Sequence, residues 1–72
     1  MIDRPETVLD MARRHVLEGE ERLARQIALV AKLERDNQTE AAVLGSKVLE
    51  AIRLSLDMSK RHVHDLESRS KR

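Results

Sequence analysis

The chain has 72 residues, carries a formal net charge of +1, and contains no cysteine, phenylalanine, tryptophan or tyrosine. A chain of this length rarely buries enough apolar surface to be stable alone, and without cysteine neither disulfides nor thiolate chemistry can contribute. Without Phe, Trp or Tyr it also lacks the rings on which single-stranded nucleic acid usually stacks. We therefore expect one helical domain over residues 1–72 that is stabilised by oligomerisation.

A first helix is predicted from about residue 4 to residue 35. Asp3 and Glu6 have the spacing of a capping box, and Pro5 suits the first helical turn, where its missing N–H costs nothing. Apolar residues then recur at the spacing of one helix face. This stripe consists of Leu9, Ala12, Val16, Leu23, Ile27, Val30 and Leu33.

A short polar turn is predicted at residues 36–39. Asn37 stands three residues before Glu40, which is again a capping-box spacing, and Thr39 is an alternative cap. So brief a connection brings two long helices together side by side and antiparallel. The second helix is predicted over about residues 40–67, followed by a frayed basic tail at 68–72. Its stripe consists of Ala42, Gly45, Leu49, Ile52, Leu56, Ser59, Val63 and Leu66.

The position of the turn also predicts the register of the hairpin. If the turn is centred near residue 37 or 38, the numbers of facing residues add up to about 75. Gly19 then lies opposite Leu56, and Gly45 lies opposite Val30. A glycine costs a helix roughly 1 kcal/mol relative to alanine, so this placement beside large side chains favours a packing role for both.

Apolar residues also occur outside the two stripes, and they predict self-association. Left exposed, they would form an unusually large apolar patch for a monomer. We predict an all-α, antiparallel, coiled-coil-like two-helix hairpin that dimerises into a four-helix bundle. The predicted self-association residues are Leu17, Ala24, Ala28, Leu44, Val48, Ala51, Leu54 and Met58. Another oligomer or a different protein partner is the alternative.

Only the histidines are candidates for metal or phosphoryl chemistry. His15, His62 and His64 each precede an acid by three residues, whereas di-iron helical bundles use the reverse order, Glu-x-x-His. His62 and His64 also point about 200° apart on a helix. His64 begins a histidine–acid–apolar sequence similar to that of sensor-kinase phosphoacceptors, but it lies on the second helix and no proline follows. We predict no enzyme activity, catalytic residue, metal or cofactor, and keep a histidine-based metal or phosphotransfer site as an alternative.

The charge and hydropathy patterns disfavour membranes and nucleic acids. The longest apolar run has five residues, so neither a membrane span nor a secretory signal is expected, and a cytoplasmic location is the default. The C-terminal region is basic, through Lys60, Arg61, Arg69, Lys71 and Arg72. These residues leave nucleic-acid association as an alternative function, although basic residues also suit the negative end of a helix dipole.

Residues 15–26 read HVLEGEERLARQ, which carries the pattern H-V-x-E-G-E-x-R-x-x-R-Q. In this pattern the chain resembles small uncharacterised bacterial helical-hairpin proteins, and the resemblance extends over most of residues 12–66. It implies a helical hairpin of bacterial origin and carries no known activity. The polar residues of the motif form either a partner surface or only a salt-bridged, solvated face: Glu18, Glu20, Arg22, Arg25 and Gln26. Together these features favour a non-enzymatic protein–protein interaction module, a small regulator or adaptor that acts as a homodimer.

Overall fold

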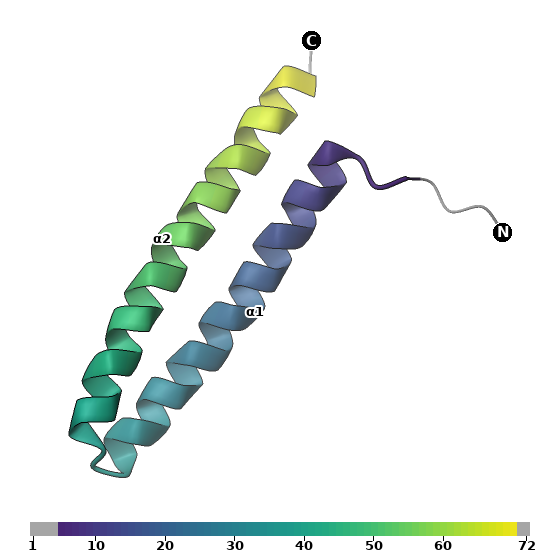
Figure 1. Ribbon diagram of the computed structural model, residues 1–72. Coiled ribbons are helices and arrows are strands. Elements are labelled where there is room, and N and C mark those ends of the chain that lie inside the picture. Colours follow the sequence, from purple (N-terminus) through teal and green to yellow (C-terminus); the bar gives the residue numbers. More distant parts are fainter. Residues whose placement is uncertain (1–4, 71–72) are drawn as a thin grey trace, which may run out of the picture.

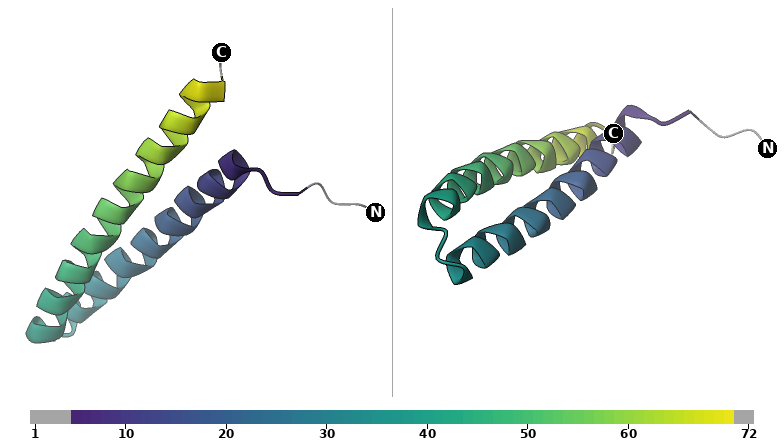
Figure 2. Two further views of the ribbon diagram at one scale, coloured as in Figure 1. Left: turned by 45° about the horizontal axis from the view of Figure 1, so that its top comes forward. Right: turned by 60° about the horizontal axis from the view of Figure 1, so that its bottom comes forward.

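The computed structural model describes residues 5–70 and consists of two α-helices (Figure 1). Helix α1 spans Val8–Arg35 and helix α2 spans Thr39–Ser70, and no strand occurs within residues 5–70. The helices pack against each other and run antiparallel, so that the start of α1 lies near the end of α2 (Figure 2). The prediction of an all-helical chain whose two helices pack together is confirmed. Neither helix has the length and apolarity needed to cross a membrane.

Helix α1 begins at Val8, about four residues later than predicted. Its N-cap is Thr7, whose hydroxyl oxygen accepts a hydrogen bond from the Asp10 N–H at 3.0 Å, while the Asp10 carboxylate accepts one from the Thr7 N–H at 3.3 Å. This reciprocal pair is the capping box of the helix. The prediction of a box at Asp3 and Glu6 is wrong, because Glu6 precedes the helix; Asp3 itself lies outside the described residues. An earlier start would add a turn without an apolar residue to pack against α2.

The turn ends α1 rather than capping α2 as predicted. Asn37 has a φ of 58°, in the left-handed region. Its N–H donates to the Glu34 carbonyl at 3.2 Å, and the Gln38 N–H donates to the Leu33 carbonyl at 2.8 Å. These two bonds make a Schellman motif, which satisfies carbonyl groups at the end of a helix. Asparagine tolerates the left-handed conformation better than most residues, and this tolerance explains its position here.

Replacing Asn37 with glycine should stabilise the protein. Glycine adopts a positive φ without strain, so we expect Asn37→Gly to raise the free energy of unfolding by about 0.5 kcal/mol. Alanine adopts a positive φ less readily than glycine or asparagine, so Asn37→Ala should lower the free energy of unfolding by about 1 kcal/mol. Urea unfolding followed by circular dichroism at one protein concentration measures both changes. Equal stability of the two variants would contradict the left-handed turn.

Helix α2 extends further than predicted. Residues 68 and 69 are helical and Ser70 is the last residue of α2, whereas we expected a frayed tail from residue 68. An ion pair of 2.9 Å between Asp65 and Arg69 spans the last turn. A basic residue at this end is also favoured by the helix dipole, which explains the additional turn. Residues 71 and 72 lie outside the described part of the chain.

The two predicted stripes form the contact between the helices. The buried residues are Ala12, Gly19 and Val30 of α1 together with Ala42, Gly45 and Leu56 of α2. A Cβ atom added to Gly19 would lie 3.0 Å from Leu56 Cδ1, and one added to Gly45 would lie 3.1 Å from Val30 Cγ2. The predicted register is therefore confirmed at both glycines. Each one makes room for a large side chain of the opposite helix.

One position of the α1 stripe was assigned wrongly. Ile27 is 45% exposed, and the half-buried residue at the interface is its neighbour Gln26. The Gln26 Nε2 donates a hydrogen bond to the Gly45 carbonyl at 2.9 Å. Interface positions on α1 recur in alternating steps of three and four residues, and the series that includes Gly19 and Val30 includes residue 26, not residue 27. A polar residue is accommodated there because the backbone of the facing glycine is accessible to its amide.

The contact between α1 and α2 buries few side chains. Within residues 5–69 the buried hydrophobic residues are Ala12, Val30, Ala42 and Leu56, and two of these are alanines. The chain exposes 6071 Å², whereas roughly 4,600 Å² is expected for a compact folded chain of this size. A single hairpin is therefore a thin structure with much of its apolar surface in contact with solvent.

Candidate functional site

One side of the hairpin carries ion pairs between the helices. Arg13 of α1 pairs with Glu67 of α2 at 2.9 Å, and Glu20 pairs with Lys60 at 4.0 Å. Residues seven apart share a helix face, so both pairs cross the same edge of the contact between the helices. We call this the ion-pair side. All four side chains are at least one-third exposed, so the pairs orient the helices but add little stability.

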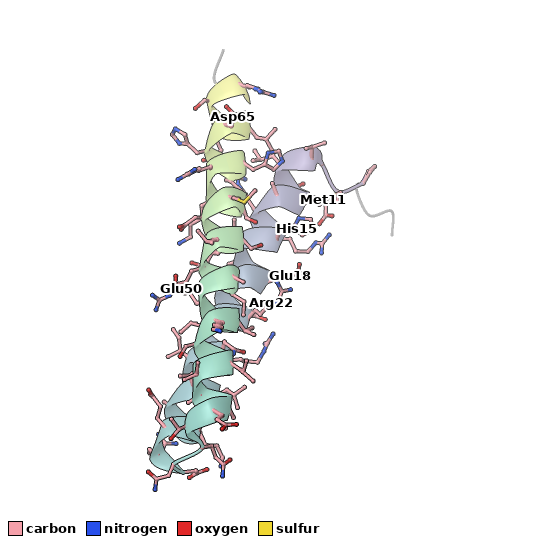
Figure 3. The ribbon with its side chains drawn as sticks, turned by 60° about the vertical axis from the view of Figure 1, so that its left-hand side comes forward. Met11, His15, Glu18, Arg22, Glu50 and Asp65 are labelled. Atoms are coloured by element: carbon pink, nitrogen blue, oxygen red, sulfur yellow. The ribbon has the colours of Figure 1, made fainter. Side chains whose placement is uncertain are left out.

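The opposite side has a small polar hollow near its middle. His15, Glu18 and Arg22 of α1 line it together with Ser55 and Ser59 of α2. The hollow has a volume of about 210 Å³, and Gly19, Ile52 and Leu56 also line it. Figure 3 shows Met11, His15, Glu18 and Arg22 in a row along this side of α1, with Glu50 on the other side of the hairpin.

Hydrophobic residues extend from this hollow toward both ends of the molecule. On α1, three of them lie four or seven residues from His15 or Arg22, and on α2, three lie three, seven or eleven residues from Ser55. Because these spacings return to the same face of a helix, the six residues lie on the face that carries the hollow. We call this the apolar side. Its hydrophobic residues are Val8, Met11, Leu29, Leu44, Val48 and Met58. They are six of the ten exposed large hydrophobic residues in the described part of the chain.

The eight predicted self-association residues are all exposed, but they do not share one face. Leu44, Val48, Ala51 and Met58 lie on the apolar side. Leu17 and Ala24 lie on the ion-pair side, where Leu17 lines a hollow with Arg13 and Lys60. Ala28 and Leu54 point away from the opposite helix. Only four of the eight can therefore meet one flat partner.

The residues of the sequence motif are also divided among different surfaces. Glu18 and Arg22 line the polar hollow on the apolar side, whereas Glu20 lies on the ion-pair side. Arg25 is exposed and lies 3.9 Å from Glu21. The prediction that Gln26 belongs to a partner surface is wrong. Its side-chain amide lies between the two helices and donates a hydrogen bond to the Gly45 carbonyl.

The histidines are not gathered into one site. His15 lines the polar hollow, whereas His62 and His64 line another depression on α2 with Met58 and Asp65. Within residues 5–70 no three His, Asp or Glu side chains are placed to hold a metal ion. All three imidazoles are exposed, so none lies in the water-excluded environment that strengthens acid–base or nucleophilic catalysis.

A cluster of charged side chains at the start of α1 reaches the polar hollow through Glu18. Arg14 donates to both carboxylate oxygens of Glu6, with distances of 2.9 and 3.0 Å, and to Glu18 at 3.2 Å. The hydrogen bond from Arg14 holds the pKa of Glu6 below its ordinary value, and the same bond raises the pKa of the guanidinium. These hydrogen bonds join Glu6, which precedes the helix, to Arg14 and Glu18 of α1.

The apolar side is therefore the most extensive candidate site of the molecule. It joins exposed aliphatic and Met side chains from both helices and has one acid and one base, Glu18 and Arg22, at its centre. Such a surface suits a macromolecular partner better than a small ligand, because it is broad and has no enclosed cavity. No protein-family model, curated protein or solved structure matches this chain.

Proposed function

We propose that the protein is a non-enzymatic interaction module that acts in the cytoplasm as a homodimer, with two hairpins forming a four-helix bundle. One observation carries the proposal. Within residues 5–69 the hairpin buries four hydrophobic residues and leaves ten large ones exposed. Burial of apolar surface is the main driving force of folding and association, at about 25 cal/mol per Å², so a second hairpin offers stabilisation that the single hairpin lacks.

The shape of the hairpin supports the same function. Two long helices present flat sides, and a four-helix bundle arises when two such sides meet. In the bundle each helix contacts two neighbours, so its apolar stripe can be wider than a simple two-helix contact requires. The outward surfaces of a bundle remain available for a further protein, which is the arrangement expected of a small regulator or adaptor.

Light scattering of the eluting protein, with detection by refractive index, tests this proposal over a wide range of concentration. The chain has no Trp or Tyr, so absorbance at 280 nm cannot serve for detection. We expect twice the mass of one chain, and a loss of helicity on dilution that follows dissociation. A monomer that stays fully helical at every concentration would contradict the proposal.

A further inference from the structure

We propose that the apolar side is the surface that binds a second copy of this chain. In the proposed pair, α1 packs on α1 and α2 packs on α2 of the second copy, each pair being antiparallel about a single two-fold axis. This inference rests on the proposed function, self-association, and adds the face, the orientation and the residues. Five observations support it: the spacing on α2, the pairing of that spacing with itself, the self-pairing of α1, the similar height of the two pairing centres, and the composition of the ion-pair side.

Helix α2 has a second apolar stripe beside the one that faces α1. Its positions alternate in steps of four and three residues, which is the spacing of a coiled-coil contact. The stripe consists of Leu44, Val48, Ala51, Ser55, Met58 and His62. Leu44 is 63% exposed and Met58 is 68% exposed, so the hairpin itself leaves this stripe open.

This stripe is complementary to itself when two copies of α2 run antiparallel about a point near residue 53. Val48 then lies opposite Met58 of the second copy, and Ala51 lies opposite Ser55. The centre thus contains small residues that allow the helices to approach closely, and larger aliphatic and Met side chains pack on either side. Leu44 meets His62 of the second copy near the ends, where an amphipathic ring can lie partly in solvent.

Helix α1 is complementary to itself on the same side, about a point near residue 20. Met11 then lies opposite Leu29 of the second copy, which joins two exposed apolar residues. Glu18, which accepts a hydrogen bond from Arg14 of its own chain, also lies opposite Arg22 of the second copy, and the two-fold symmetry forms this ion pair twice. His15 falls opposite Arg25, where two basic side chains come together. The apolar and Glu–Arg contacts outnumber this unfavourable one.

The two centres coincide within the hairpin. In the register of the hairpin, residue 20 at the centre of the α1 pair faces a position near residue 55 of α2. The centre of the α2 pair is residue 53, which is two residues, or about 3 Å, away along the helix. One two-fold axis can therefore serve both helix pairs at once. The relative height of the two centres is set by the packing of α1 against α2.

The ion-pair side lacks such complementarity. Pairing through it would take both interhelical pairs, Arg13–Glu67 and Glu20–Lys60, out of water, so that each copy desolvates these four charges. It carries fewer exposed large hydrophobic residues, such as Leu17 and Ile27. The apolar side is therefore the face that a second hairpin covers.

The first experiment compares matched glutamate substitutions on the two sides. Val48→Glu/Met58→Glu places carboxylates on either side of the centre of the proposed interface, and we expect the dimer to weaken by more than roughly a hundredfold by light scattering. Leu17→Glu is the control, since Leu17 is 62% exposed but lies on the ion-pair side. The control should remain a dimer. Dissociation by Leu17→Glu together with an intact Val48→Glu/Met58→Glu dimer would overturn the proposed face while leaving self-association in place.

The second experiment tests the antiparallel α1 pair even if the double variant fails to fold. Glu18→Arg and Arg22→Glu each bring like charges together in their own homodimer, but mixed together they restore opposite charges at both positions. We expect native mass spectrometry of the mixture, with one variant isotope-labelled, to show a heterodimer fraction well above the statistical half. A statistical mixture would overturn the proposed pairing. A monomeric parent protein would instead contradict both this pairing and the proposed function.

Discussion

Leu56→Ala should lower the free energy of unfolding by about 2–4 kcal/mol, the largest effect we expect from one substitution. Leu56 is 5% exposed and its Cδ1 fills the space beside Gly19. Truncation leaves a cavity that α1 cannot close, because the facing position has no side chain. For a structure with so few buried side chains, this loss is sufficient to unfold much of the population.

The matched control is Leu17→Ala, which removes the same atoms from an exposed position. Leu17 is 62% exposed, so we expect a change of less than about 0.5 kcal/mol. Urea unfolding followed by circular dichroism compares the two variants. Both must be measured at the same protein concentration, because dimerisation makes apparent stability depend on concentration. Similar losses for both leucines would show that the interface does not centre on Leu56.

Gly45→Val should destabilise the protein by about 1–3 kcal/mol, even though valine is a better helix former than glycine. A Cβ at this position would lie 3.1 Å from Val30 Cγ2, 3.6 Å from Gln26 Nε2 and 3.7 Å from Leu33 Cδ1. Three side chains of α1 therefore enclose it. Valine adds two further methyl groups, which force the helices apart and displace the Gln26 amide from the Gly45 carbonyl.

Ser46→Val is the control for Gly45→Val, because it introduces the same side chain at the next position of α2, where the residue is exposed. We expect its free energy of unfolding to stay within about 0.5 kcal/mol of the parent protein. Thermal unfolding of the two variants at one concentration makes the comparison. If Gly45→Val is as stable as Ser46→Val, the close approach of the helices at Gly45 is not required for folding.

The contact between Gln26 and Gly45 also gives the hairpin a means of selecting its register. The side-chain amide is half-buried and donates to a carbonyl that only a residue without a side chain exposes so well. A shift of the helices by one heptad would leave this amide without its partner in the interface, at a cost of about 1–3 kcal/mol. The same shift would also separate Gly19 from Leu56 and Gly45 from Val30.

The sequence by itself determined the two helices and the way in which they face each other. The apolar spacing of three and four residues defines one stripe on each helix, and the short turn near Asn37 leaves a single antiparallel register. Gly19 and Gly45 could be placed opposite Leu56 and Val30 for this reason alone. In a hairpin, the position of the turn fixes every facing pair.

Local details were harder to predict because several residues offer the same chemistry. Asp3 and Thr7 both begin a capping-box spacing, and the structure forms the box at Thr7 and Asp10. Asn37 can cap a following helix or end a preceding one, and the choice depends on its backbone conformation. Gln26 was assigned to the surface because it is polar, yet the facing glycine provides a carbonyl for it.

Only the tertiary structure decided which exposed apolar residues belong together. Each helix, taken alone, has extra apolar positions beside its stripe, and the sequence suggested a common surface for Leu17 and Met58. Antiparallel packing instead places Leu17 on the ion-pair side and Met58 on the apolar side. The physical reason is that helical spacing places residues around the axis of one helix only. Which residues of two helices share a face depends on how each helix is rotated about its own axis when the two pack together.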